Sequence, residues 1–120
     1  MNIEELREYC LSVKGAEESF PFDETVLVFK VMGKMFAFTG LDAPEGRFAV
    51  ALKCDPDRSV ILREQYGGIG PSHYGNSLLW NSVEIQSDVS DELIRELIDH
   101  SVEEVLKKLP RKKREEYFTL

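Results

Sequence analysis

Residues 25–54 decide the fold, and they read TVLVFKVMGKMFAFTGLDAPEGRFAVALKC. The stretch is rich in β-branched and aromatic residues, and its apolar positions recur at every second residue, as in a strand. Gly33 interrupts the first run, and a looser turn with Asp42, Pro44 and Gly46 interrupts the second. Glycine between two alternating runs is typical of a hairpin. We therefore predict a three-stranded antiparallel meander with strands over 25–31, 35–39 and 47–54.

Each predicted strand has a core face and an outer face, because successive side chains point to opposite sides of a sheet. Phe36 and Phe38 are expected to point to the same side. The inward set of the first and third strands comprises Leu27, Phe29, Val31, Phe48, Val50, Leu52 and Cys54. The outer face brings several cations together, and any DNA contact is expected to use them. These candidate nucleic-acid-binding residues are Lys30, Lys34 at the hairpin tip, Arg47 and Lys53.

Two helices flank this meander. The first begins at Asn2, which can form a capping box with Glu5, and ends near Gly15, a residue suited to a left-handed C-terminal cap. The second begins at Asp55-Pro56, a capping residue followed by a residue preorganised for the first turn, and stops before Gly67-Gly68. Its apolar contacts are expected from Val60, Ile61 and Leu62.

The last helix is the clearest helical pattern in the chain. Ser90 can cap its start, and Pro110 closes it. Its apolar stripe, which spans about five turns, comprises Leu93, Ile94, Leu97, Ile98, Ser101, Val105 and Leu109. The basic run 111–114 frays or briefly extends this helix, and cations there complement the helix dipole without any ligand. A nucleic-acid contact is the alternative, but we expect it to matter less than one on the sheet face.

The remaining segments complete an α+β domain over 1–120. Residues 16–24 contain Pro21 and no periodicity, and they predict a loop. Residues 78–86 alternate like a strand, and a short strand near 69–73 is an option. The expected order is α-β-β-β-α-β(-β)-α, with an antiparallel sheet packed against the helices.

Charge and length limit the function classes. The 120 residues suit one domain. The net charge is −7, and because 107–120 hold six cations and two anions, the first 106 residues carry −11. Such a balance opposes non-specific attraction to nucleic acid or anionic membrane, so any DNA binding should be weak. The N-terminus has no signal-peptide pattern and no apolar run could span a bilayer, so we expect a cytoplasmic protein without membrane contact.

No motif for catalysis, cofactor or metal binding is found. The glycines at 67–70 lack the lysine and the following helix of a phosphate loop. His73, His100, Cys10 and Cys54 lack the short spacing of zinc ligands. Both cysteines lie in apolar patterns and are expected to be buried, reduced thiols. We therefore expect no metal, no cofactor and no enzymatic activity.

The segment 71–82, PSHYGNSLLWNS, has an unusual content of aromatic, histidine and carboxamide groups. One interpretation is a stabilised loop, in which asparagines form turns and Trp80 covers small residues on the outer sheet face. The other is a recognition surface, because loop-borne aromatic and amide groups on a rigid sheet suit binding. The candidate recognition residues are His73, Tyr74, Asn76, Trp80 and Asn81.

Four stretches of the chain resemble the MmcQ/YjbR family of small bacterial proteins. They are 20–22 (FPF), 28–37 (VFKVMGKMFA), 52–56 (LKCDP) with Arg63-Glu64, and 80–83 (WNSV) followed by 97–101 (LIDHS). The family loop usually carries two histidines where this chain has Tyr74 and Leu79, whereas Asn76, Trp80 and Asn81 match it.

The resemblance implies a CyaY-like or double-wing fold with a curved open sheet face. Proteins of this family are commonly labelled DNA-binding by analogy of that fold, and fold alone does not determine function. The first functional hypothesis is therefore a DNA-binding or regulatory protein. The alternative is a module that binds a protein or a small molecule through the 74–81 loop.

Overall fold

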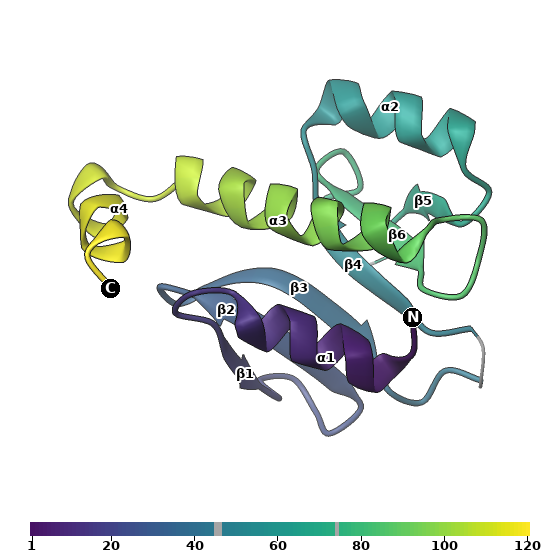
Figure 1. The fold of residues 1–120 in the computed structure, drawn as a ribbon, viewed down its shortest axis with the longest axis horizontal. Coiled ribbons are helices and arrows are strands. Elements are labelled where there is room, and N and C mark those ends of the chain that lie inside the picture. Colours follow the sequence, from purple (N-terminus) through teal and green to yellow (C-terminus); the bar gives the residue numbers. More distant parts are fainter. Residues whose placement is uncertain (45–46, 74) are drawn as a thin grey trace.

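The predicted meander is the centre of the structure. It consists of β2 (Val26–Val31), β3 (Lys34–Gly40) and β4 (Ala49–Lys53), which pair antiparallel. The computed structural model describes residues 1–44, 47–73 and 75–120. Three further strands, β1 (Glu17–Ser19), β5 (Ile69–Pro71) and β6 (Trp80–Glu84), extend the sheet to the order β1-β2-β3-β4-β6-β5 (Figure 1). Every pairing is antiparallel, so the predicted α+β class is confirmed.

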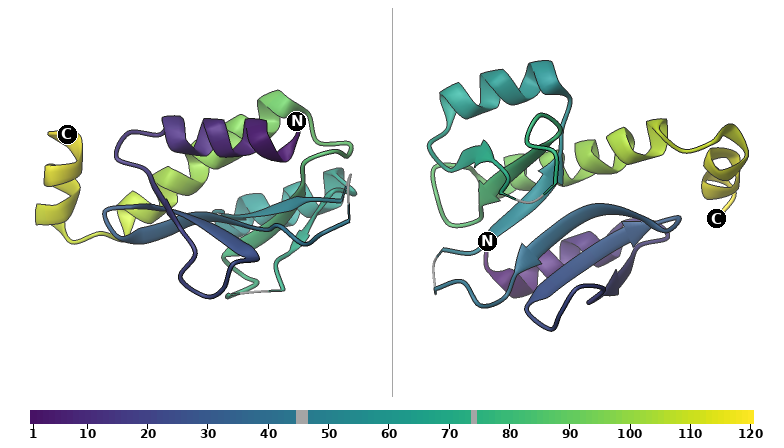
Figure 2. Two further views of the ribbon diagram at one scale, coloured as in Figure 1. Left: turned by 90° about the horizontal axis from the view of Figure 1, so that it is seen from below. Right: turned by 180° about the vertical axis from the view of Figure 1, so that it is seen from behind.

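Helices cover one face of the sheet and leave the other open. α1 (Ile3–Ser12) and α3 (Asp91–Lys107) lie on the same side of it (Figure 2, left), and both begin at the predicted caps. The Asn2 side chain accepts from the Glu5 N–H at 2.8 Å, and the Ser90 hydroxyl accepts from the Leu93 N–H at 3.1 Å. Between these helices and the sheet lies the main core, which includes Leu6, Phe29, Phe36, Leu52, Ile94 and Ile98. No helix in the described part of the chain is long and apolar enough to cross a membrane.

Phe36 and Phe38 point to opposite sides of the sheet, contrary to the prediction, because β3 contains a β-bulge. Phe29 pairs with Ala37 and Lys30 with Met35, so Phe36 has no partner across the ladder. The extra residue shifts the alternation. Phe36 consequently points into the main core, and Phe38 belongs to a second cluster on the open face with Val28 and Ala51.

Two local predictions held only in part, because packing against the rest of the chain, and not the local pattern, determined the outcome. The expected loop 16–24 contains β1, whose Glu17 lies opposite Lys30. Three residues are too few to show periodicity, and the edge of β2 supplies their pairing. α2 (Pro56–Gln65) buries only Ser59 and Leu62 among its residues, while Val60 and Ile61 are 58% and 54% exposed. Residues 59 and 62 share one side of a helix, and this narrow side is the one that contacts the body.

The basic run after Pro110 forms a separate helix, α4 (Arg111–Phe118), and neither frays nor extends α3. Its Tyr117 is buried, and Gly15, with φ +74°, lets the chain pass close to the Tyr117 ring. Lys14 Nζ lies 5.4 Å from the centroid of that ring. Residues 111–114 therefore form the first turn of a helix and not the last.

Candidate functional site

The open face of the sheet carries a hollow of about 690 Å³. Its floor is mainly apolar and comes from four strands: Val26, Met35, Phe38, Ala49, Ala51 and Ser82. Its rim comes from the loops, with Phe22, Asp23 and Thr25 before β2, Asp42, Ala43 and Arg47 before β4, and Ser72, His73 and Gly75 after β5. A volume of this size is typical of small-molecule sites, which occupy about 300–1,000 Å³.

Small side chains create the hollow. Ala51 lies directly opposite Ser82 across β4 and β6, and Ala49 is the next outward residue on β4. Phe38 on β3 is much larger than Ala49 and Ala51 on β4, so the hollow is deeper over β4 than over β3. Larger residues at these positions would fill the space.

The rim carries both signs of charge. The Asp23 carboxylate accepts hydrogen bonds from the N–H and the hydroxyl of Thr25, at 2.7 and 2.5 Å, and these bonds lower its pKa. Asp23 is thus an anion whose hydrogen bonds to Thr25 stabilise the loop before β2. The guanidinium of Arg47, by contrast, forms no ion pair with any residue that the structure describes. Arg47 is the rim cation that is available to a ligand.

α2 holds the predicted recognition loop in place through Arg63. Its Nε donates to Asn81 Oδ1 at 2.8 Å, and its terminal nitrogen donates to the carbonyl of Ser77 at 2.5 Å. Asn81 in turn donates to the Ser59 hydroxyl at 3.0 Å and is 2% exposed. Arg63 was missed as a site residue, although its presence in a matched stretch was a signal.

The candidate loop residues have different surroundings. Asn81 is enclosed by the Arg63 contacts, and Asn76 forms a turn by accepting from the Leu78 N–H at 2.9 Å. Trp80 packs on Phe38 with ring centroids 5.4 Å apart, beside Ala51. His73 is exposed and lines the hollow, while Tyr74 lies outside the described residues. Of the described candidates, His73 is therefore the one that faces the hollow directly.

Trp80 gives a test of the structural interpretation of the loop. We expect Trp80→Ala to lower the free energy of unfolding by about 1–3 kcal/mol, and Tm by several degrees, because the contact with Phe38 is lost. Trp80→Phe should lose less, since it keeps an aromatic ring. Thermal unfolding followed by circular dichroism measures both, and an unchanged Tm for Trp80→Ala would contradict the packing role.

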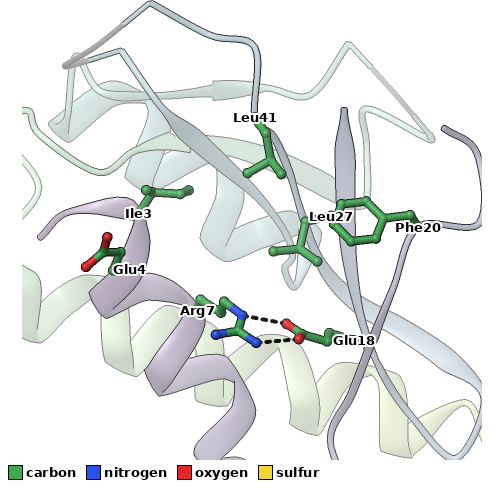
Figure 3. Close-up of a pocket in the computed structure, with 7 residues that line it drawn as sticks. All are labelled: Ile3, Glu4, Arg7, Glu18, Phe20, Leu27 and Leu41. Carbon is green, nitrogen blue, oxygen red and sulfur yellow. Dashed lines mark hydrogen bonds and ion pairs between the residues drawn. The ribbon is translucent and has the colours of Figure 1, made fainter. Parts of the chain in front are cut away.

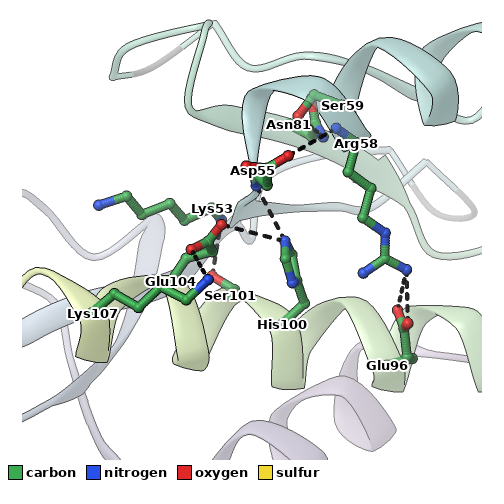
Figure 4. A network of polar contacts seen from close by, with 10 residues as sticks. All are labelled: Lys53, Asp55, Arg58, Ser59, Asn81, Glu96, His100, Ser101, Glu104 and Lys107. Carbon is green, nitrogen blue, oxygen red and sulfur yellow. Dashed lines mark hydrogen bonds and ion pairs between the residues drawn. The ribbon is translucent and has the colours of Figure 1, made fainter.

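The four predicted DNA-contacting cations do not line the hollow together. Arg47 is on its rim. Lys30 lies opposite Glu17 of β1, and Lys34 begins β3 at the hairpin. Lys53 ends β4, and its side chain extends toward the C-terminal end of α3 (Figure 4). A DNA contact through these four residues stays a prediction.

Comparison with known proteins places the chain in a family. Residues 11–103 match the family model described as YjbR. The uncharacterized protein YjbR of Escherichia coli K12 is 34% identical over 114 residues, which cover 95% of each chain. The chain belongs to the YjbR family. The uncharacterized protein YbdF of Escherichia coli O157:H7 is 31% identical over 98 residues, which cover 82% of this chain and 79% of that one.

Solved structures share the fold of this YjbR-family chain. The crystal structure of Deinococcus radiodurans protein DR2400, a DUF419 domain, matches with a TM-score of 0.84 at 33% identity and covers 97% of this chain and 87% of that one. A Pseudomonas syringae protein matches with a TM-score of 0.72 at 21% identity, over 84% of this chain and 96% of that one. The second likeness concerns the fold alone.

A smaller groove of about 320 Å³ lies on the helix side of the YjbR domain, between α1 and β1 (Figure 3). Its apolar lining includes Phe20, Leu27 and Leu41. Arg7 of α1 spans it and donates to both carboxylate oxygens of Glu18, at 2.7 and 2.5 Å. This exposed bidentate pair links β1 to α1, in addition to the pairing of β1 with β2.

A polar network joins α3 to the sheet and to α2 (Figure 4). The Ser101 hydroxyl donates to the Phe36 carbonyl at 2.6 Å and accepts from the Lys53 N–H at 2.9 Å. His100 Nε2 accepts from the Asp55 N–H at 3.1 Å, and Arg58 pairs with Glu96 at 2.6 Å. These contacts hold α3 against the sheet and against the start of α2.

The cysteines have the surroundings of structural thiols. Cys10 and Cys54 are both free and buried. Burial raises the pKa of the Cys10 thiol to about 12, and it also raises the pKa of Cys54. Nucleophilic chemistry needs the thiolate, which these surroundings disfavour. No group of His, Cys, Asp or Glu with the geometry of a metal site occurs in residues 1–44, 47–73 and 75–120.

Proposed function

We propose that this YjbR-family chain is a binding module for a small molecule with a flat apolar body and an anionic group. The observation that carries the proposal is the hollow on the open face, which combines an apolar floor with the Arg47 guanidinium, a cation that has no ion-pair partner among the described residues. An aromatic or aliphatic body would cover Phe38, Met35 and Val26. The anionic group would pair with Arg47, because arginine presents several donors in a fixed plane to such groups.

The rim charges favour a small ligand over a DNA backbone at this face. Asp23 and Asp42 line the same hollow as Arg47, and the first 106 residues carry a net −11. A duplex would bring many phosphates near these carboxylates, whereas a ligand with one anionic group can place it beside Arg47. A DNA-binding role through the outer face thus has the weaker support. No catalytic step is part of the proposal.

The test uses 8-anilinonaphthalene-1-sulfonate, a flat apolar probe with one sulfonate. Trp80 is the single tryptophan and packs on Phe38 of the floor, so a bound probe should quench Trp80 emission by energy transfer. We expect Arg47→Gln to weaken binding by about 10-fold, because one charged hydrogen-bonded contact is lost. Ala49→Leu and Ser82→Leu should each weaken it by about 10-fold or more, since the added side chain occupies the hollow.

The matched control is Lys34→Gln, which removes the same charge at the hairpin and should leave probe binding unchanged. Thermal unfolding of every variant confirms that it is folded, because the probe also binds partly unfolded chains. Equal probe affinity for native protein, Arg47→Gln and Ser82→Leu, all folded, would contradict the proposal.

A further inference from the structure

One end of the molecule collects cations that the sequence distributes over two distant segments. α4 lies beyond the C-terminal end of α3, at one extreme of the long axis in every view (Figures 1 and 2). The Lys53 side chain, from the end of β4, extends toward this end of α3 (Figure 4). We call this surface the basic pole, and it comprises Lys107, Lys108, Lys112, Lys113 and Arg114, with Lys53 close to Lys108.

Helix stability does not explain the cations of α4. A helix N-terminus carries partial positive charge, so cations in the first turn are unfavourable there and anions are favourable. α4 has no acidic residue in its first turn and no side-chain cap from Pro110. The dipole explanation applies to Lys107, which is in the last turn of α3, but not to residues 111–114.

Most of these cations also lack an ion-pair partner among the described residues. Lys107 lies 3.2 Å from Glu104, and Arg111 pairs with Glu115 at 3.0 Å on the exposed surface. Within the described chain, Lys108, Lys112, Lys113 and Arg114 form no ion pair. Lys53 and Lys108 repel each other, and burial together with the Lys108 charge lowers the pKa of Lys53. Among the described residues, the pole therefore concentrates cations that mostly lack an ion-pair partner, on a body that is otherwise strongly acidic.

We propose that the basic pole binds the phosphate backbone of single-stranded nucleic acid. Lys112 and Lys113 are exposed cations in the first turn of α4 that can contact phosphates, and a flexible strand can reach this end of the molecule with little contact with the acidic body. Phe118 is 65% exposed beside the cations and offers a ring on which a base can stack. An anionic membrane is less suited, because Phe118 and Leu120 are too few to form an apolar helix face.

The experiment measures the fluorescence anisotropy of a labelled oligothymidylate of about 20 nucleotides at two salt concentrations, about 20 and 150 mM. The pole variant is Lys112→Glu with Lys113→Glu. The control is Lys30→Glu with Arg47→Glu, which changes the net charge equally but on the sheet face. We expect the pole variant to bind about 10-fold more weakly at low salt and the control less than about 3-fold more weakly.

Two further readouts separate backbone contact from stacking. Loss of two phosphate contacts should reduce the slope of log affinity against log salt by about 1.4, at roughly 0.7 per contact on a single strand. Phe118→Ala should weaken binding about 5-fold or more and leave that slope unchanged.

Four outcomes would overturn the proposal. They are equal losses in the pole and control variants, loss in the control alone, no oligonucleotide binding by native protein at low salt, and binding to phosphatidylserine vesicles in place of the oligonucleotide. Thermal unfolding checks that each variant is folded, and the substituted residues of α4 are exposed. The hollow on the open face is untouched by the pole variant, so probe binding there should be unchanged.

Discussion

Replacing Leu97 by alanine should lower the free energy of unfolding by about 2–5 kcal/mol. Leu97 is 3% exposed and belongs to the main core between α3 and the sheet. Truncation removes buried apolar surface and leaves a cavity that rigid strands on one side cannot close. Because domains of this kind have about 5–15 kcal/mol of stability in total, the loss would be a large fraction of it.

Urea unfolding followed by circular dichroism measures this effect as a shift of the midpoint at constant slope. The matched control is Leu78→Ala, the same truncation at a position that is 70% exposed, where the expected change is within about 0.5 kcal/mol. A Leu97→Ala midpoint equal to that of native protein would mean that α3 presents a different face to the sheet.

The second large effect is expected from Ser101→Ala, at about 2–4 kcal/mol. Ser101 is fully buried, and its hydroxyl bridges the Phe36 carbonyl on β3 and the Lys53 N–H on β4. Alanine keeps the volume nearly constant but leaves two backbone groups without their partner, each at a cost of about 1–3 kcal/mol. Denaturant unfolding measures the loss.

Ser12→Ala is the control for Ser101→Ala, because its hydroxyl donates to the Tyr9 carbonyl at 2.6 Å on the exposed side of α1. Water can replace that bond, so we expect a change within about 0.5 kcal/mol. Equal stabilities for the two variants would show that the buried bridge makes no special contribution.

Local signals predicted most of the fold. The capping box of Asn2 and Glu5, the Asp55 and Ser90 caps and the alternation in 47–54 each act within a few residues, and all appear in the structure. Elements with weak local patterns were missed. β1 depends on the edge of β2, and α4 depends on the burial of its Tyr117.

The candidate site was only partly predictable. His73 was identified from the composition of its loop, and it lines the hollow. Asn81 was identified too, but its buried side chain is hydrogen-bonded to Arg63 and Ser59, which are distant from it in sequence. The hollow itself arises from small residues on adjacent strands. Small residues alone do not indicate a hollow in a sequence, because the hollow depends on which of them lie side by side.

The sequence by itself determined the helix ends, the three-stranded meander and the family, because caps, alternation and matched stretches are local or linear properties. Only the tertiary structure decided which way residues at the bulge point and which side chains from separate segments meet. The bulge at Phe36 turned that ring into the core, and the end of β4 brought Lys53 near Lys108 of α3. A hollow and a charged pole are made by side chains from separate segments, so they exist only once packing brings those segments together.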